Sequence, residues 1–210
     1  MVKTTMLTTP LTDMELAAVS DYLRRGGVIV APSETVYGLS AMAGNYKASR
    51  QIRKLKRRHL QSPFIVLMES IEQVYEWIAP PGPETKELMK VFWPGPLTLV
   101  LSQKEQGDPL CTGRRDTIGV RVSPDPVCSL LLNRTGMPLL STSANPAGRE
   151  PALTAESAEK YFRDKVGFII NDGARSRRPP STVIEMTGRS PLVLREGAVP
   201  SAKIFAVLGK

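Results

Sequence analysis

The sequence contains few of the residues on which most catalytic and metal-binding sites depend. It has one histidine, His59, and two cysteines, Cys111 and Cys128. A single histidine excludes the HExxH metal motif and argues against histidine-based catalysis. Two widely spaced cysteines are too few for a disulfide framework or a zinc site.

Long apolar runs are also missing. No stretch approaches the ~20 apolar residues that a membrane-spanning helix needs. The N-terminal residues MVKTTMLTTPLTD contain no apolar core of signal-peptide length, so we expect a cytoplasmic protein. No repeat or long linker divides the 210 residues, and a hydrophobic content of 41% is enough for a sizeable core. A single domain is therefore expected.

Two common nucleotide-binding motifs, GxxxxGK[ST] and GxGxxG, do not occur in the sequence. The net charge of +8 nevertheless indicates a polyanionic partner. That partner can be a nucleic acid, a nucleotide or a substrate that carries phosphate, and the charge alone does not choose among them.

Hydrophobic periodicity and turn residues predict the alternating helices and strands of an α/β fold. Helices are predicted at residues 13–25, 45–58, 71–78, 84–92, 127–132 and 154–163, with a short helix in the C-terminal tail. Strands are predicted at residues 28–31, 35–39, 64–68, 97–101, 117–122, 138–140, 166–170, 181–186 and 191–194. The turn at residues 93–96 is expected to be structural, with Trp93 in the core.

Residues 26–40, GGVIVAPSETVYGLS, end a predicted strand in a cluster of polar side chains. Pro32 ends the strand because it has no N–H for the sheet. An open α/β sheet often presents its ligand site where a strand ends in this way. An ordinary turn that begins at proline is the alternative. Ser33 and Glu34 are expected mainly to shape the turn that presents Thr35.

The predicted helix at residues 45–58 is strongly basic and contains no acidic residue. Repulsion between like charges one turn apart, such as Arg50 and Lys54, costs roughly a few tenths of a kcal/mol. This cost favours an anion nearby, and a solvated basic face is the alternative. Lys56 and Arg58 would point to opposite sides of a continuing helix. They can approach the same phosphate only if the helix ends near Lys56.

Residues 117–122, TIGVRV, alternate along a predicted strand, so that Thr117, Gly119 and Arg121 share one face. An arginine on an inward face needs a partner, which can be a structural salt bridge or an anionic ligand. Residues 141–145, STSAN, form another hydroxyl-rich cluster. Their N–H and O–H groups can bind phosphate oxygens, but such residues also form simple turns.

Hydroxyl and arginine residues follow or end several predicted strands: Thr35, Thr117, Arg121, Ser141, Ser143, Ser181 and Arg195. In a twisted α/β sheet such strand ends can gather at one edge and form a positively charged, hydroxyl-lined cleft. This cleft would suit a nucleoside triphosphate together with a small polar co-substrate. Because the sequence offers few general bases, catalysis would depend on positioning and charge neutralisation.

Several motifs occur in an order that resembles the YrdC-type threonylcarbamoyl-AMP synthases. They are PSETVYGL, the KxR of Lys56 and Arg58, WPGPLT, TIGVRV, STSAN, the PSTV at residues 180–183, and LREG. The resemblance spans about residues 13–200 and implies one YrdC-like domain over residues 1–210, with short tails. It also implies an α/β fold in which a twisted mixed β-sheet with flanking helices surrounds a concave basic cleft.

The resemblance implies a nucleotidyltransferase, an L-threonylcarbamoyladenylate synthase. L-Threonine, bicarbonate and ATP, with Mg²⁺, would give threonylcarbamoyl-AMP and pyrophosphate. This is the first stage in forming the threonylcarbamoyladenosine of tRNA. A tRNA threonylcarbamoyl transferase would use the product, direct contact with RNA or tRNA stays open, and no membrane partner is implied.

The resemblance also assigns roles to individual positions. The implied threonine-binding residues are Thr35, Arg121, Ser141 and Ser181. The implied ATP-binding residues are Lys56, Arg58, Ser62, Thr117, Ser143, Asn145 and Arg195, with Lys56 and Arg58 as catalytic residues. No protein side chain is assigned to the metal. The sequence departs from the family pattern at Ser33, Ser40, Ser62 and Leu67, and the C-terminal domain of the longer synthases is expected to be missing.

Two other functions stay open. A YrdC-like protein that binds RNA on its basic concave face, without making the adenylate, would also explain the charge of +8. A carbamoyl-adenylate activity, as in the related domain of hydrogenase-maturation carbamoyltransferases, fits less well because the other domains of those proteins are missing.

Overall fold

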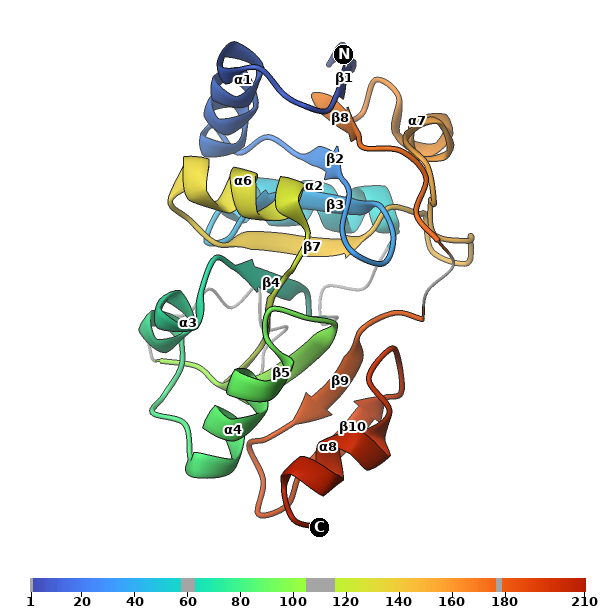
Figure 1. Ribbon diagram of the computed structural model, residues 1–210. Helices are drawn as coiled ribbons and strands as arrows, with labels where there is room; N and C mark the ends of the chain where they lie inside the picture. Colours follow the sequence, from blue (N-terminus) through green and yellow to red (C-terminus); the bar gives the residue numbers. More distant parts are fainter. Residues whose placement is uncertain (1, 58–62, 105–115, 177–178) are drawn as a thin grey trace.

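The computed structural model describes residues 2–57, 63–104, 116–176 and 179–210, which form an α/β fold (Figure 1). The helices are α1 (Asp13–Arg24), α2 (Tyr46–Lys56), α3 (Ile71–Trp77), α4 (Pro83–Phe92), α6 (Pro126–Thr135), α7 (Ala155–Phe162) and α8 (Ser201–Val207). The strands are β1 (Thr5–Thr8), β2 (Ile29–Ala31), β3 (Gly38–Met42), β4 (Ile65–Met68), β5 (Leu97–Ser102), β6 (Thr117–Val122), β7 (Leu139–Ser143), β8 (Phe168–Asn171), β9 (Thr182–Glu185) and β10 (Leu192–Arg195). In this part of the chain, no helix combines the length and the apolar character needed to cross a membrane.

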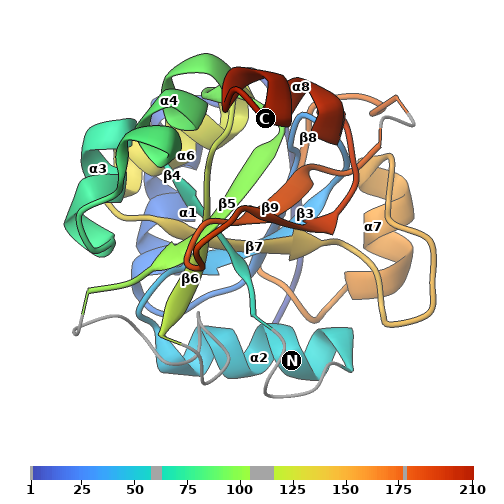
Figure 2. The ribbon, with the colours of Figure 1, turned by 90° about the horizontal axis from the view of Figure 1, so that it is seen from below.

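The strands form one ten-stranded sheet in the order β1-β8-β2-β3-β7-β4-β6-β5-β9-β10. The sheet is mixed, since β4 pairs with β6 in parallel and with β7 antiparallel. Figure 2 views the sheet from its β10 end and shows the strands turning relative to one another. Such a twist accumulates from the right-handed twist of each strand. The predicted twisted mixed sheet is confirmed.

Local sequence signals explain where the helices begin and end. The side chains of Thr12, Asn45 and Asp125 accept hydrogen bonds from the first backbone N–H groups of α1, α2 and α6. Helix α2 ends at Lys56 because Arg57 adopts a left-handed conformation with φ of 51°. The helix is therefore shorter than the predicted residues 45–58, and the condition that it end near Lys56 is met.

The strand register puts small and polar residues of neighbouring strands on one face of the sheet. Ser40 lies beside Ser141, Ser141 beside Ile65, and Ile65 beside Gly119. Paired residues of adjacent strands point to the same side, so Arg121, two residues beyond Gly119, shares this side. We call this side the polar face.

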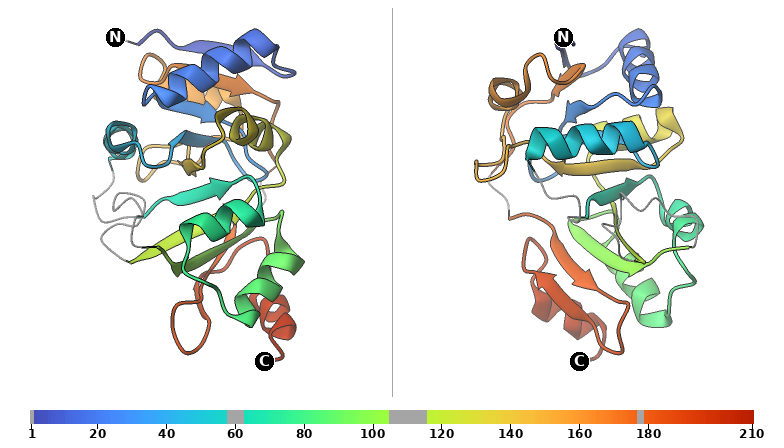
Figure 3. Two further views of the ribbon diagram at one scale, coloured as in Figure 1. Left: turned by 90° about the vertical axis from the view of Figure 1, so that its left-hand side faces the viewer. Right: turned by 180° about the vertical axis from the view of Figure 1, so that it is seen from behind.

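The opposite face is apolar, and helices cover it along the sheet. Leu39, Val66 and Val120 lie in a core that also contains buried residues of α2, α3, α4, α7 and α8. The polar face is covered only in part, where α1 and α6 pack on Ile29 and Leu67. Figure 3 shows α2 on one side of the upper strands and α1 and α6 on the other. The rest of the polar face stays accessible.

The predicted strands differ from the observed ones at two places that matter for the site. Strand β3 begins at Gly38, because the residues before it form a turn in which the Ser33 N–H bonds the Val36 carbonyl at 3.1 Å. Strand β7 continues to Ser143, so the hydroxyl residues 141–143 belong to the strand and do not follow it. The prediction that the strand ends before Ser141 is wrong.

Strand β1 was not predicted, and it pairs with β8 at one edge of the sheet.

Trp93, at the turn of residues 93–96, lies in the core. It is 6% exposed, and its indole N–H donates to the Leu97 carbonyl at 2.6 Å. The predicted structural role of Trp93 is confirmed.

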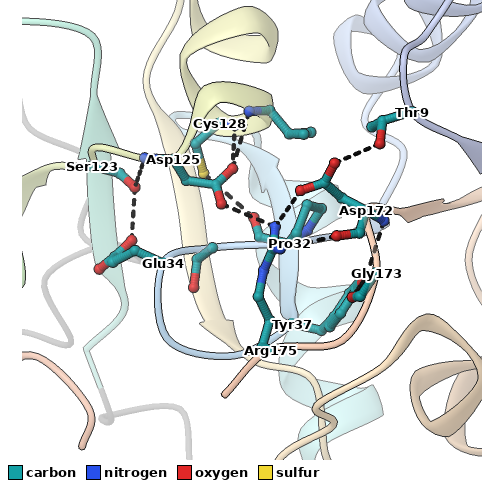
Figure 4. Close-up of polar contacts among 12 residues, drawn as sticks. Thr9, Pro32, Glu34, Tyr37, Ser123, Asp125, Cys128, Asp172, Gly173 and Arg175 are labelled. Carbon is teal, nitrogen blue, oxygen red and sulfur yellow. Dashed lines mark hydrogen bonds and ion pairs between the residues drawn. The ribbon is translucent and has the colours of Figure 1, made fainter. Parts of the chain in front are cut away.

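Tyr37 joins two segments that are distant in the sequence. Its side chain is fully buried, and its hydroxyl donates to the Gly173 carbonyl at 2.7 Å and accepts from the Asp172 N–H at 3.1 Å. Burial raises the pKa of Tyr37 above its ordinary value, so the hydroxyl keeps its proton. Figure 4 shows this contact between the segment after β8 and the turn before β3.

Replacement of Tyr37 by phenylalanine should lower the free energy of unfolding by about 1–3 kcal/mol, because two partly buried hydrogen bonds, each worth about 0.5–1.5 kcal/mol net, are lost. Urea unfolding followed by circular dichroism measures the change. Tyr46→Phe is the matched control, since Tyr46 is 59% exposed, and its effect should stay within about 0.5 kcal/mol. Equal losses in the two variants would contradict the role of the Tyr37 hydroxyl.

Candidate functional site

A cavity of about 930 Å³ opens on the accessible part of the polar face. This volume is typical of sites for small molecules and cofactors. The sheet forms its floor, and loops before β3, after β7 and before β9 form its walls. The polar residues that line it, among those described, are Ser33, Thr35, Lys56, Thr98, Thr117, Arg121, Ser141, Thr142, Ser143, Glu150, Ser181 and Arg195.

The structure brings most of the predicted site residues together. The lining includes Thr35, Lys56, Thr117, Arg121, Ser141, Ser143, Ser181 and Arg195. Arg58 and Ser62 lie outside the described residues. Thr117, Ser143 and Arg195 stand at the ends of β6, β7 and β10, whereas Gly119 and Ser141 line the cavity from within β6 and β7. Alternation along β6 and β7 places them there.

The turn before β3 presents Thr35 to the cavity. The Ser33 hydroxyl donates to the Val36 carbonyl at 2.7 Å, and the backbone N–H groups of Thr35 and Val36 approach the same hydroxyl, each at 3.4 Å. The two hydroxyl oxygens of Ser33 and Thr35 lie 3.3 Å apart. Ser33 therefore organises the turn, as predicted, and fixes the position of the Thr35 side chain.

Arg121 lies on the floor of the cavity and is only 5% exposed. Its Nη1 lies 3.0 Å from Oε1 of Glu34, and Oε2 of Glu34 accepts a hydrogen bond from Ser123 at 2.8 Å. The Nε of Arg121 is buried and has no hydrogen-bond partner among the described residues. The structural salt bridge, one of the two alternatives that the sequence left open, is therefore present, and Arg121 also lines the cavity. Glu34 pairs with Arg121 and does more than shape the turn.

Lys56 is buried at the end of α2, and its ammonium reaches the residues that follow β7. It donates to the Ser143 carbonyl at 2.7 Å, to the Ser143 hydroxyl at 3.2 Å and to Oδ1 of Asn145 at 2.7 Å. The Asn145 amide in turn donates to the Arg149 carbonyl. Asn145 is not among the described lining residues. It lies behind the cavity wall and holds Lys56 in place.

Ser181 and Arg195 close the side of the cavity near β9 and β10. Arg195 is exposed, and it donates from Nε and Nη2 to the Ser181 carbonyl at 3.1 and 2.8 Å. Its Nη2 also lies 3.0 Å from the Ser181 hydroxyl, which is 3.0 Å from the hydroxyl of Thr98. A side chain at Gly197 would meet the Pro180 carbonyl at 2.2 Å, so the two segments approach this closely only with glycine.

A second polar cluster lies beside the turn before β3 (Figure 4). Arg175 forms ion pairs with Asp125 at 3.1 Å and with Asp172 at 2.7 Å. Burial raises the pKa of Asp125, although the N–H groups of Cys128 and Val127 and the charge of Arg175 act against this shift. The hydrogen bond from Thr9 lowers the pKa of Asp172. The cluster ties the segment before β9 to the start of α6.

Cys128 lies next to this cluster and is not a candidate nucleophile. Its side chain is fully buried and points its thiol toward the Pro32 carbonyl at 3.7 Å. Burial raises the pKa of the Cys128 thiol to about 12. The reactive thiolate form is therefore scarce at neutral pH.

Sequence analysis missed the carboxylates that hold the arginines of this region. Glu34 was assigned to the turn, and Asp125, Asp172 and Arg175 received no role. Asp125 carried one local signal, since an aspartate before a proline and an apolar run is typical of a helix N-cap. The ion pairs of Arg121 with Glu34 and of Arg175 with Asp125 join residues far apart in the chain and have no local signal, whereas Asp172 lies only three positions before Arg175.

The cavity combines cations with many neutral donors. Lys56, Arg121 and Arg195 line it, and Glu150 is the one carboxylate among the described lining residues. Hydroxyl groups from β6, β7 and the segment before β9 complete the polar surface. Fixed donors of this kind stabilise negative charge in a partly dehydrated site. The arrangement suits anionic ligands that carry phosphate or carboxylate groups.

Comparison with known proteins gives consistent matches. A family model for Sua5, YciO and YrdC proteins, described as "Telomere recombination", matches residues 21–197. The threonylcarbamoyl-AMP synthase of Pyrococcus abyssi is 34% identical over 199 residues, which are 94% of this chain and 58% of that protein. The threonylcarbamoyl-AMP synthase of Marinobacter nauticus is 37% identical over 175 residues, which are 82% of this chain and 92% of that protein.

A solved structure gives the same result. The crystal structure of P. abyssi Sua5 complexed with L-threonine superposes with a TM-score of 0.92 at 32% identity, covering 98% of this chain and 61% of that one. The chain therefore spans less than two thirds of the Pyrococcus protein and most of the Marinobacter protein. With a matching family model over most of its length and relatives above 30% identity, this protein belongs to the Sua5/YciO/YrdC family.

Proposed function

We propose that this protein is a threonylcarbamoyl-AMP synthase that acts on L-threonine, bicarbonate and ATP. The observation that supports this most directly is the cavity itself, which gathers the four predicted threonine-binding side chains and, of the predicted ATP-binding ones, Lys56, Thr117, Ser143 and Arg195. The name of the Marinobacter relative, which this chain covers almost completely, agrees with the proposal. So does the threonine in the Pyrococcus Sua5 structure, which has the same fold.

The threonine would bind on the floor of the cavity. Arg121 is proposed to hold its carboxylate, because a guanidinium offers parallel N–H donors that fit the two carboxylate oxygens. Thr35, Ser141 and Ser181 would supply hydroxyl groups around the rest of the amino acid.

The ATP phosphates would lie near Lys56, Thr117, Ser143 and Arg195. Asn145 supports this side indirectly, since it holds the Lys56 ammonium and does not line the cavity. Arg58 and Ser62 remain predicted ATP-binding residues. Lys56 and Arg58 would offset the charge that develops on the phosphates during transfer.

The reaction needs little proton transfer by protein side chains. The amine of threonine condenses with bicarbonate to give a carbamate and water. A carbamate oxygen then attacks the α-phosphorus of ATP, and the bond between that phosphorus and the bridging oxygen breaks as pyrophosphate leaves. The protein contributes by holding the two substrates in line and by neutralising charge, which makes it a nucleotidyltransferase.

Mg²⁺ would enter with ATP. The described residues contain no group of three or more histidine, cysteine, aspartate or glutamate side chains that could hold a metal. The lining matches a Mg²⁺ that is bound mainly by phosphate oxygens and water, as is common in nucleotide sites. Lys56 and Arg195 would then share the remaining phosphate charge.

The product is an activated acyl group and must be passed to an acceptor. We propose a tRNA threonylcarbamoyl transferase as the partner that consumes it. Binding of RNA without synthesis is the alternative function, and the net charge of +8 is compatible with it. The first experiment below separates the two.

Purified protein incubated with ATP, Mg²⁺, bicarbonate and L-threonine should release pyrophosphate, and omission of threonine should abolish the release. A pyrophosphatase-coupled phosphate assay measures the rate, and mass spectrometry identifies threonylcarbamoyl-AMP. Release that needs carbamoyl phosphate in place of threonine would indicate the carbamoyl-adenylate activity. A folded protein without either activity that binds RNA would overturn the proposal in favour of the RNA-binding function.

Thr35→Ala should weaken threonine binding by about 1 kcal/mol, the net value of one hydrogen bond, which is roughly a fivefold increase in the KM for threonine. The KM for ATP should stay close to that of the unchanged protein. Steady-state rates at varied threonine concentration measure the effect. Thr35→Ser keeps the hydroxyl and serves as the control, and an equal loss in both variants would exclude the hydroxyl as the binding group.

Lys56→Met removes the ammonium and keeps most of the side-chain volume. Loss of a hydrogen bond to a charged group costs about 1.5–3 kcal/mol, so kcat/KM for ATP should fall by roughly 10- to 100-fold. Lys54→Met is the control, because Lys54 is exposed on the same helix and does not line the cavity. Similar activity in the two variants would refute the role of Lys56.

A further inference from the structure

Glu34 lies next to the proposed threonine site, and neither the family resemblance nor the proposed mechanism gives it a role. It pairs with Arg121 at 3.0 Å, and the two side chains are 11% and 6% exposed. We propose that Glu34 is a positioning residue that sets the orientation and the effective charge of Arg121, so that this end of the cavity selects an amino acid over phosphate. The inference rests on the proposed function, because it takes Arg121 as the receptor of the threonine carboxylate.

Glu34 acts through Arg121 and does not touch the ligand itself. It is not among the described residues that line the cavity, whereas its neighbours Ser33 and Thr35 are. Its Oε1 is buried against Arg121, and its Oε2 accepts the Ser123 hydroxyl at 2.8 Å. Both carboxylate oxygens are therefore directed away from the cavity, toward fixed protein groups.

Ser123 keeps the carboxylate of Glu34 in this position. Its hydroxyl oxygen accepts the backbone N–H of Asp125 at 3.2 Å. A carboxylate can only accept, so the single hydroxyl proton of Ser123 is directed to Glu34. Asp125 is itself fixed, since its carboxylate caps α6 and pairs with Arg175. Figure 4 shows Ser123 between Glu34 and Asp125.

This arrangement leaves a defined edge of Arg121 for a ligand. A guanidinium carries five N–H donors in a rigid plane. Glu34 forms its ion pair at Nη1, and Nε is buried and has no hydrogen-bond partner among the described residues. Because Arg121 lines the cavity while its Nε is buried, a carboxylate in the cavity would contact the guanidinium through its Nη groups. Without Glu34, the arginine side chain would have no fixed orientation around its long axis.

The same pair also controls charge. Arg121 and Glu34 together are neutral, so this end of the cavity attracts a simple anion less than an unpaired arginine would. A phosphate dianion on Arg121 would lie close to the Glu34 carboxylate and be repelled. A zwitterionic amino acid brings its own positive group with its carboxylate and avoids this penalty. The cavity must also receive a triphosphate, so discrimination against phosphate at Arg121 keeps the two substrates apart.

Glu34→Gln tests the proposal, because it removes the charge and nearly preserves the shape. Isothermal titration calorimetry should show threonine binding weakened by about tenfold, which corresponds to about 1.4 kcal/mol. Inorganic phosphate that competes with threonine should bind about tenfold more tightly, because the Coulomb repulsion from the Glu34 carboxylate is lost. The affinity for ATP should stay within about twofold of that of the unchanged protein. The lost charge lies beside Arg121, and its effect on the ATP side of the cavity is partly screened.

Two further variants separate the effect of the Glu34 charge from the effect of orienting Arg121 and from a general loss of structure. Ser123→Ala keeps both charges and removes one hydrogen bond, so threonine binding should weaken by roughly two- to fivefold with phosphate binding unchanged. Glu159→Gln is the matched control, because it removes an exposed ion pair with Arg163 on α7, and it should change neither affinity. Circular dichroism and the unfolding midpoint establish that each variant is folded.

The outcomes decide between the possibilities. Unchanged phosphate affinity in folded Glu34→Gln would overturn the charge role, and equal weakening of threonine and ATP would indicate a merely structural one. If Glu34→Gln does not fold, Ser123→Ala carries the test, and a threonine affinity equal to that of the unchanged protein would overturn the positioning role. Binding of threonine without release of pyrophosphate would refute the proposed function and leave this inference standing. Absence of threonine binding in the unchanged protein would overturn both.

Discussion

The need to compensate buried positive charge governs the structure around the cavity. Lys56 and Arg121 are each about 5–6% exposed, and Arg175 is largely shielded from solvent. An unpaired cation in such surroundings would be strongly destabilising. Each of the three is satisfied by protein partners: Lys56 by Ser143 and Asn145, Arg121 by Glu34, and Arg175 by Asp125 and Asp172. Lys56 and Arg121, which line the cavity, are therefore held in place by the protein.

These ion pairs and hydrogen bonds also decide how the loops are held. The contacts of Lys56 hold the end of α2 against the residues that follow β7. The contacts of Glu34, Ser123 and Arg175 link the turn before β3, the start of α6 and the segment before β9 into one connected wall. Such a wall needs little rearrangement when a ligand binds. Preorganised donors of this kind favour charge stabilisation over proton transfer. This agrees with a proposed reaction in which the substrates supply the nucleophile and the leaving group.

The strongly twisted sheet provides the rigid base for this wall. One face is apolar along the sheet and is covered by helices, whereas the polar face is covered by α1 and α6 over only part of its area. The same strands thus contribute to the core with one set of residues and to the site with the alternate set. In β6, Val120 lies in the core and Arg121 in the cavity. Stability and function are encoded on alternate positions of one strand.

The sequence by itself determined the features that depend on a few neighbouring residues. It predicted the α/β class, most helices and strands, the shared face of Thr117 and Arg121, and the condition that α2 end near Lys56. The order of its motifs pointed to the family. Only the tertiary structure decided the strand order, the placement of the site on the sheet face, and the pairing of Glu34 with Arg121 and of Lys56 with Asn145. Caps, alternation and turns leave local signals, whereas the choice of a distant partner depends on register and packing that form only when the chain has folded.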